Sequence, residues 1–338
     1  GTYQSVENVY EEYTKDALRE GPISRPLKVV LAAGNGTGGR FVPDVLRKLG
    51  CEVIELDCTP DWDFKRYNPN PEDVAFLHNI SEVTKANRAD VGIGIDGDGD
   101  RIGVVDDQGH EIFSDILGLL VARAICPQNP GRPVVIDVKS TGLYFDDPVL
   151  KASNTPIVLW KTGHSYIKAK VAETNALAGF EKSGHWFLNS PIGRGYDDAV
   201  LSTVQFLRML AAAGKPLSQL HAELPKTWNS PTLGPYCADH EKYSVVDAVA
   251  AQYAEDMKNG VKIGGETIKD IVTVNGVRFQ LADDSWGLVR ASSNKPSLVL
   301  VAESRKSRDQ MYDIVEHIQA RLAATGKVGE YDQQLPPR

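Results

Sequence analysis

The sequence predicts two similar α/β domains followed by a smaller α+β domain. As far as about residue 224, apolar strand-like runs alternate with helical segments, an order typical of α/β folds. Beyond that point, short strand-like runs cluster between two helices, which is typical of an α+β domain. At 338 residues the chain also exceeds one ordinary core. We expect domains at residues 1–126, 127–232 and 233–338, with the Pro- and Gly-rich segment 127–133 as the clearest linker.

The amino-acid composition limits the classes of protein to which this chain can belong. A hydrophobic content of 42% and a charged content of 24% are those of a globular protein in water. The net charge of −8 argues against a nucleic-acid partner, because phosphate-backbone binders carry basic surfaces. No apolar run approaches the ~20 residues of a membrane span. The 4 cysteines show no metal-ligand spacing, so we expect reduced thiols in a cytoplasmic protein.

The first domain is expected to begin with a polar helical lead-in and to continue as strand–helix units. Its predicted elements are a helical segment within 3–19, a strand at 27–33, a helix at 41–49, a strand at 52–56, a helix from about Pro71 to Ala86, two strands around 96–101, and a helix at 114–125. The glycine-rich loop 34–39 lacks the spacing of a nucleotide-binding loop, so nucleotide binding is not favoured.

The second and third domains show the same kinds of pattern. Their predicted elements are strands at 134–137 and 156–160, helices at 165–174, 198–213 and 217–224, a helix at 244–258, several strands between 268 and 301, and a final helix at 308–323. We see no residue-level repeat between the first two domains, so their similarity is architectural.

The most informative stretch is Asp96-Gly-Asp98-Gly-Asp100-Arg101, which lies between two apolar runs. Three carboxylates at every second position repel one another unless a cation lies among them. Oxygen ligands favour a hard ion such as Mg²⁺ or Ca²⁺. The pattern therefore predicts a metal site at Asp96, Asp98 and Asp100.

This loop has three competing interpretations. A plain acidic turn explains the glycines but not the three carboxylates. An EF-hand fails, because Arg101 would stand where that loop needs glycine and strands replace the flanking helices. A haloacid-dehalogenase-type phosphatase, with Asp96 as nucleophile, remains an alternative.

Polar clusters follow the strands of the second domain, at 137–141, 161–165 and 179–185. Ligands bind at the carboxyl ends of parallel strands in this class of fold. Together the clusters bring histidines, lysines, a glutamate and hydroxyls to one edge, which suits a polyhydroxylated phosphate ester.

The third domain contains Arg290-Ala-Ser292-Ser293-Asn294-Lys-Pro between two strands. A cation, hydroxyls, an amide and backbone N–H groups form a plausible anion site. A simple polar hairpin turn is the alternative interpretation.

The aspartate loop resembles the metal-binding loop of the α-D-phosphohexomutases, the phosphomannomutase/phosphoglucomutase family. The resemblance implies two α/β/α mixed-sheet domains and a smaller α+β domain, with Mg²⁺ held by the three aspartates. It also implies that Arg101 faces the substrate as a catalytic residue.

Two further loops are similar to motifs of this family, in the family's order. Glu181-Lys-Ser183-Gly-His185 resembles the sugar-recognition loop, which implies that Glu181 and Ser183 bind sugar hydroxyls and that His185 is catalytic. The loop from Arg290 resembles the phosphate-binding loop, with Ser293 and Asn294 departing from its usual middle pair. The remaining substrate-facing positions implied by the resemblance are Lys139 and His164, and Arg290, Ser292, Ser293 and Asn294 in the phosphate loop.

The resemblance implies interconversion of hexose 1-phosphate and hexose 6-phosphate, of glucose or mannose, through a phosphoserine. Glucose 1,6-bisphosphate or mannose 1,6-bisphosphate would be the intermediate and activator. The family's phosphoserine loop does not occur in this sequence. We therefore expect a piece of a longer mutase, with the missing N-terminal domain as partner, and an isolated chain that binds sugar phosphate without turnover.

Overall fold

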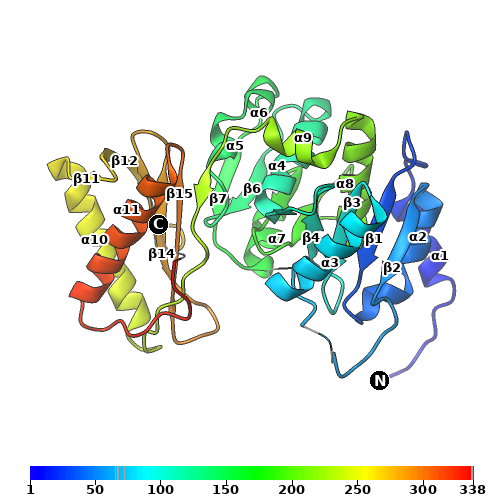
Figure 1. Ribbon diagram of the computed structural model, residues 1–338, viewed down its shortest axis with the longest axis horizontal. Coiled ribbons are helices and arrows are strands. Elements are labelled where there is room, and N and C mark those ends of the chain that lie inside the picture. The colour runs from blue at the N-terminus through cyan, green and yellow to red at the C-terminus, as the bar shows by residue number, and fades with distance from the viewer. Residues whose placement is uncertain (65, 67, 72, 336–337) are drawn as a thin grey trace. The chain divides into compact units, whose positions relative to one another are not determined.

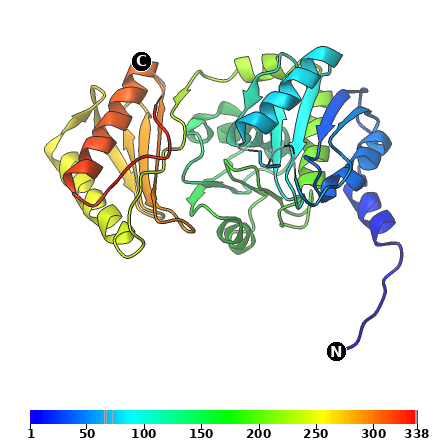
Figure 2. The same ribbon diagram turned by 60° about the horizontal axis from the view of Figure 1, so that its bottom comes forward.

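The computed structural model describes residues 1–64, 66, 68–71, 73–335 and 338, which form two compact units. The segments of the first unit are Gly1–Ile136, Asp147–Val158 and Gly163–Leu224. Those of the second are Asp137–Asp146, Leu159–Thr162 and Pro225–Arg338. Figures 1 and 2 show the elements of both units.

A mixed five-stranded sheet forms the first half of unit one, in the order β2-β1-β3-β4-β5. Its strands are β1 (Lys28–Ala32), β2 (Glu52–Leu56), β3 (Val91–Ile95), β4 (Ile102–Val105) and β5 (Glu111–Ile112). β1 pairs parallel with β2 and β3, whereas β3, β4 and β5 pair antiparallel. Every residue of β3 and β4 is buried, as expected of central strands covered on both faces.

The helices that precede the second sheet along the chain are α1 (Val9–Ala17), η1 (Thr37–Arg40), α2 (Val42–Leu49), α3 (Val74–Asn87) and α4 (Ser114–Ile125), the last of which contacts both β4 and β8. The sequence predicts α2, α3 and α4, but it places Pro71 in the first turn of α3. The structure corrects this point: α3 begins later, and the Asp73 carboxylate caps it by accepting the N–H of Phe76 at 3.1 Å. Pro71 instead lies before the helix.

A mixed four-stranded sheet, in the order β7-β6-β8-β9, follows. Its strands are β6 (Val134–Asp137), β7 (Ile157–Trp160), β8 (Ala178–Phe180) and β9 (Trp186–Leu188). β8 lies parallel to β6 and antiparallel to β9. The accompanying helices are η2 (Cys126–Gln128), α5 (Leu143–Asp146), α6 (Pro148–Ala152), α7 (His164–Glu173), α8 (Ala199–Ala213) and α9 (Leu217–Ala222).

Helix α8 joins the two halves of unit one. Ten of its residues are buried, and it contacts both β4 and β9. Its N-cap is Asp198, whose carboxylate accepts the N–H groups of Val200 and Leu201 at 2.9 and 3.0 Å. Tyr13 of α1 donates its hydroxyl to the same carboxylate at 2.8 Å, which attaches the lead-in helix.

Unit two is built on a six-stranded sheet in the order β10-β15-β14-β13-β12-β11. Its elements are β10 (Trp228–Asn229), α10 (Lys242–Asn259), β11 (Lys262–Ile263), β12 (Glu266–Val272), β13 (Val277–Leu281), β14 (Trp286–Ala291), β15 (Leu298–Ser304) and α11 (Arg308–Ala324). Alternate strand residues such as Phe279, Val289 and Leu300 pack in one cluster with residues of α10 and α11. Trp286 and Leu288 pack with Val138 in a separate cluster.

The predicted fold class is confirmed, since both α/β sheets are mixed and a smaller α+β region follows. None of the helices in the described part of the chain has the length and hydropathy of a bilayer span. All four cysteines are unpaired and buried.

Candidate active site

The aspartate loop is folded around the Asp96 carboxylate, which is fully buried at the end of β3. Its Oδ1 accepts the backbone N–H groups of Gly99, Asp100 and Arg101 at 3.1, 3.0 and 3.1 Å. Its Oδ2 accepts the Nε–H of Arg101 at 2.7 Å. The glycine-rich loop after β1 supports this turn, because the N–H of Thr37 donates to the Gly97 carbonyl at 3.0 Å.

The carboxylates of Asp96, Asp98 and Asp100 offer oxygens that all lie within 4.8 Å of one another. The Oδ1 atom of Asp100 is buried and, among the described residues, accepts no hydrogen bond. Burial raises the pKa of Asp96 to about 6, so its charged form is poorly compensated by protein groups alone. A small hard cation such as Mg²⁺ fits these three ligands, because it would occupy the free oxygen and offset the crowded negative charge.

The Arg101 guanidinium is fixed by two hydrogen bonds. Its Nε is bound to Asp96, and its Nη1 donates to Oδ1 of Asn70 at 3.0 Å. Its backbone pairs antiparallel with His185, so the aspartate loop and the loop between β8 and β9 lie side by side. The sequence indicates Asn70 only as part of a bend, and its contact with Arg101 was not predicted.

The loop between β8 and β9 approaches the aspartate loop closely at Gly184. The N–H of Ile102 donates to the Gly184 carbonyl at 3.1 Å. Gly184 has φ +109°, and a Cβ there would lie 2.7 Å from the Ile102 carbonyl oxygen. Only glycine can adopt this φ and also leave room for the Ile102 carbonyl without strain.

Glu181 and His185 form the centre of this loop. The buried Glu181 carboxylate accepts the N–H of Gly163 at 2.5 Å and contacts Nδ1 of His185 at 3.1 Å. Ser183 Oγ lies 3.2 Å from the same nitrogen. Phe180 is buried and packs edge-on against Trp186 with ring centroids 5.4 Å apart.

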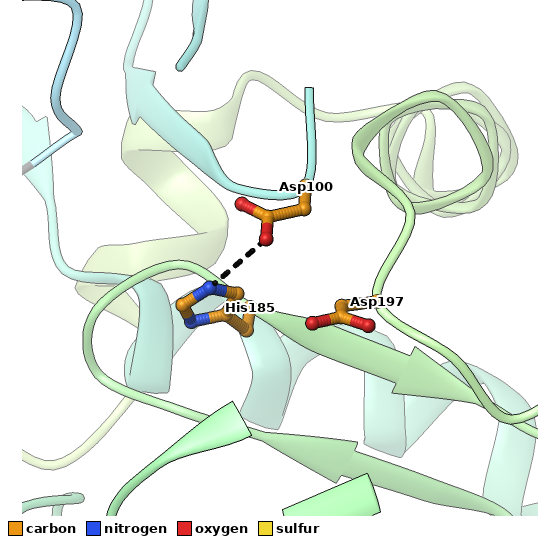
Figure 3. A group of neighbouring side chains, drawn as sticks. All are labelled: Asp100, His185 and Asp197. Atoms are coloured by element: carbon orange, nitrogen blue, oxygen red, sulfur yellow. Dashed lines mark ion pairs between the residues drawn. The ribbon is translucent and has the colours of Figure 1, made fainter. Parts of the chain in front are cut away.

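His185 connects the loop to the aspartates, as Figure 3 shows: its Nε2 lies 3.5 Å from Oδ2 of Asp100. Burial opposes the charge on the ring, but hydrogen bonds to Asp100 and Glu181 outweigh it and raise the pKa of His185 to about 9. The hydrogen bond from His185 lowers the pKa of Asp100 to about 2. At neutral pH the pair is therefore an imidazolium and a carboxylate.

A further carboxylate, Asp197, was not predicted as a site residue. Its Oδ2 lies 3.0 Å from Nδ1 of His164, and its Oδ1 lies 3.0 Å from Nζ of Lys168. The sequence shows Asp197 only as one of two acids before α8. Asp198 is the cap of that helix, so the first acid of the pair is left for another role. The presence of two adjacent acids before one helix was the only feature of the sequence that could have indicated Asp197 as a site residue.

In unit two, the predicted phosphate loop is the turn between β14 and β15. Arg290 and Ser292 are buried, whereas Ser293 and Asn294 are exposed. Arg290 Nη1 donates to the Ala291 carbonyl at 3.0 Å, and Ser292 Oγ donates to Oδ1 of Asn294 at 3.2 Å.

Lys139 also belongs to unit two, in the turn after β6, and is buried. The neighbouring Asp137 orders this turn, since it accepts hydrogen bonds from Ser140 Oγ at 2.6 Å and Thr162 Oγ1 at 3.0 Å. The structure thus brings together the aspartate loop, Arg101, Glu181, Ser183, His185 and His164 in unit one. The remaining predicted residues, Lys139, Arg290, Ser292, Ser293 and Asn294, lie in unit two.

Comparison with known families matches three consecutive domain models along the chain. They are described as phosphoglucomutase/phosphomannomutase α/β/α domain II over residues 7–109, α/β/α domain III over 113–228, and the C-terminal domain over 237–321. The chain belongs to the phosphoglucomutase/phosphomannomutase family. The aspartate loop falls in domain II, and the Glu181–His185 loop falls in domain III.

Individual family members agree with this assignment. A phosphomannomutase/phosphoglucomutase of Pseudomonas putida is 34% identical over 304 residues, which is 90% of this chain and 62% of that relative. A crystal structure of a phosphoglucomutase/phosphomannomutase family protein from Burkholderia thailandensis is 30% identical, with a TM-score of 0.84 over 100% of this chain and 68% of that one. The chain thus spans about 62% of the first of these relatives.

A more distant structure shares the fold alone. It is the N-acetylphosphoglucosamine mutase of Aspergillus fumigatus, solved with GlcNAc-6P and magnesium. It is 16% identical to this chain, with a TM-score of 0.64 over 96% of this chain and 67% of that one.

Proposed function

We propose that this chain is the metal- and sugar-phosphate-binding part of a phosphohexomutase that interconverts hexose 1-phosphate and hexose 6-phosphate. The observation that carries the proposal is the junction of the two loops of unit one. His185 Nε2 lies 3.5 Å from Asp100, and the backbones of Arg101 and His185 pair. A metal-binding loop and a hydroxyl-recognition loop would thereby act on one bound sugar.

In this proposal Asp96, Asp98 and Asp100 hold Mg²⁺, which when bound would neutralise charge on a transferring phosphoryl group. The Arg101 guanidinium and the His185 imidazolium add fixed positive charge beside that group. Both are oriented before substrate binds, by Asp96 in one case and by Glu181 in the other. Such preorganised charge is the main means of catalysis in phosphoryl transfer.

The remaining residues would bind the sugar phosphate. Glu181 would accept hydrogen bonds from sugar hydroxyls, and Ser183 could accept or donate them. Lys139 and His164 would face the substrate. Arg290, with Ser292, Ser293 and Asn294, would bind the phosphate that is not being transferred. The Aspergillus structure, which was solved with GlcNAc-6P and magnesium, shares the fold of this chain.

The phosphoryl donor would be a phosphoserine from the part of the relatives that this chain does not match. Transfer to a hexose monophosphate would give the glucose or mannose 1,6-bisphosphate, and return of the other phosphate would complete the exchange. We propose domain boundaries near residues 126 and 232; the gap between the second and third family models, at 228–237, supports the second of these boundaries. The unpaired cysteines support a cytoplasmic location.

The phosphatase alternative is disfavoured by the family assignment, because domain models of the phosphoglucomutase/phosphomannomutase family match residues 7–109, 113–228 and 237–321. A haloacid-dehalogenase-type enzyme would instead use Asp96 as a covalent nucleophile. Failure to detect an acyl phosphate on Asp96 after incubation with a hexose phosphate would agree with this conclusion.

Calorimetry with the chain and Mg²⁺ tests the binding part of the proposal. We expect glucose 1-phosphate and glucose 6-phosphate to bind, and glucose without phosphate to bind far more weakly. ³¹P NMR with added glucose 1,6-bisphosphate should show no interconversion by the chain alone. Absence of sugar-phosphate binding would refute the proposed site, and clear turnover would refute the external phosphoserine.

A further inference from the structure

Asp100, His185 and Asp197 form a second cluster beside the aspartate loop, which Figure 3 shows from three separate segments. Asp100 belongs to the loop after β3, His185 precedes β9, and Asp197 precedes α8. Each can offer one ligand atom, and these atoms all lie within 4.8 Å of one another. This set contains an imidazole, which the three aspartates of the loop do not.

The imidazole of His185 is oriented as in metal sites. Its Nδ1 contacts the buried carboxylate of Glu181 at 3.1 Å, and this contact leaves Nε2 directed at Asp100. A carboxylate that binds the distal ring nitrogen is the usual outer-shell partner of a metal-bound histidine, where it fixes the ring and increases its basicity.

The Asp197 carboxylate is fixed by His164 and Lys168. Its side chain is only 8% exposed and is bound by His164 and Lys168, which each lie 3.0 Å from one of its oxygens. The side chain of Lys168 is 42% exposed, so its ammonium can move into water when another cation takes its place. The His164 ring stacks on that of His185, with centroids 5.6 Å apart, and limits its movement.

We propose that Asp100, His185 and Asp197 are a second metal site, selective for a divalent transition ion such as Zn²⁺ or Co²⁺. Mixed imidazole and carboxylate ligands favour these ions, which would displace the ring proton of His185 on binding, and three protein ligands leave a position open for water. Mg²⁺ prefers oxygen ligands and keeps to the three aspartates. Because Asp100 is common to both sets, the two ions weaken each other's binding.

This metal site is not part of the proposed mutase reaction. The binding of an ion to it can therefore be measured without any sugar. A transition ion on His185 would also remove the imidazole from the proposed substrate site. Inhibition of the intact enzyme by Zn²⁺ would follow, but binding to the chain is the primary test.

Co²⁺ is a suitable probe, since its visible absorption reports imidazole and carboxylate coordination directly. We expect the unaltered chain to bind one Co²⁺ that Zn²⁺ displaces. His185→Gln and Asp197→Asn should each weaken Co²⁺ binding by about tenfold or more, because even outer-shell substitutions cost 10–100-fold at metal sites. Neither variant removes a ligand of the proposed Mg²⁺ site, so both should retain Mg²⁺ binding by calorimetry.

Two further variants distinguish this site from a surface histidine and from the three aspartates. His110→Gln removes an exposed histidine that is paired with Asp106 at 3.4 Å, and it should leave Co²⁺ binding unchanged. Asp98→Asn should weaken Mg²⁺ binding and spare Co²⁺. The proposal is overturned if Asp98→Asn weakens Co²⁺ binding while Asp197→Asn does not, since Co²⁺ would then occupy the three aspartates. Should His185→Gln fail to fold, Asp197→Asn alone decides between these outcomes.

Discussion

Asp96 and Arg101 are joined twice, once through the Arg101 backbone N–H at 3.1 Å and once through its Nε at 2.7 Å. The pair closes the aspartate loop and leaves the exposed Asp98 as the carboxylate with the greatest freedom. Asp96 therefore has a structural role in addition to its proposed role as a ligand, whereas Asp98 can be changed with less effect on folding.

We predict that Asp98→Asn weakens Mg²⁺ binding by about tenfold or more, because it removes one of three charged oxygen ligands. Isothermal titration calorimetry of the chain measures the effect. Asp239→Asn removes the same charge from a carboxylate that is 70% exposed and should leave Mg²⁺ binding unchanged. Equal Mg²⁺ affinity in the Asp98 variant would refute the assignment.

A second prediction concerns the contact between the two loops. Gly184→Ala should lower the free energy of unfolding by ~1–3 kcal/mol, because φ +109° is strained for alanine and its Cβ would collide with the Ile102 carbonyl. Urea denaturation measures the change. The matched control is Gly131→Ala, where φ is +77° but no atom lies within 4 Å of the added Cβ. Equal losses of unfolding free energy in the two variants would show that the contact with the Ile102 carbonyl does not contribute to the effect.

The aspartate loop was predictable because its three carboxylates are contiguous, and local spacing alone places them together. Asp197 was not, since only tertiary packing of the segment before α8 brings it to His164 and His185. The same holds for Asn70, whose contact with Arg101 joins residues that the sequence separates by a strand and a helix. Patterns along the chain do not encode such contacts.

Secondary structure followed apolar periodicity closely where elements are long, as in α4 and α8. The short helices α5 and α6 were missed, because four or five residues carry too little periodicity to be recognised. The start of α3 was placed too early at Pro71, because a proline typical of the first helical turn here precedes the capping residue Asp73.

A third prediction uses the contact between Tyr13 and Asp198. Burial and the neighbouring carboxylate raise the pKa of Tyr13 far above its ordinary 10.0. The folded chain therefore keeps this proton when the unfolded chain has lost it. Stability from this group is complete below pH 10 and falls above it, with a slope of about 1.4 kcal/mol per pH unit.

Tyr13→Phe should therefore reduce the alkaline slope of the unfolding free energy, although it also loses a hydrogen bond worth ~1 kcal/mol at neutral pH. Urea titrations at several pH values between neutrality and the alkaline range would show this. Tyr3→Phe is the control, because that side chain is 94% exposed. An unchanged alkaline slope in Tyr13→Phe would contradict the prediction.

The last prediction separates the roles of the phosphate loop and the sugar loop. Arg290 can present two N–H groups to one phosphate, whereas Glu181 can bind only donors such as hydroxyls. A charged hydrogen bond contributes ~1.5–3 kcal/mol, so Arg290→Ala should weaken sugar-phosphate binding by roughly ten- to a hundredfold. Glu181→Gln should instead change the discrimination between glucose and mannose phosphates.

Calorimetry with glucose 1-phosphate and glucose 6-phosphate distinguishes these roles. In the proposed reaction the hexose binds in two orientations, so Arg290→Ala should impair both isomers equally. Arg47→Ala is the control, because that arginine is exposed and paired with Glu55 at 2.6 Å. Thermal unfolding of Arg290→Ala and Arg290→Lys would separate lost binding from lost folding. A loss confined to one isomer would mean that this loop serves one orientation only, and the proposed exchange between the two orientations would then be wrong.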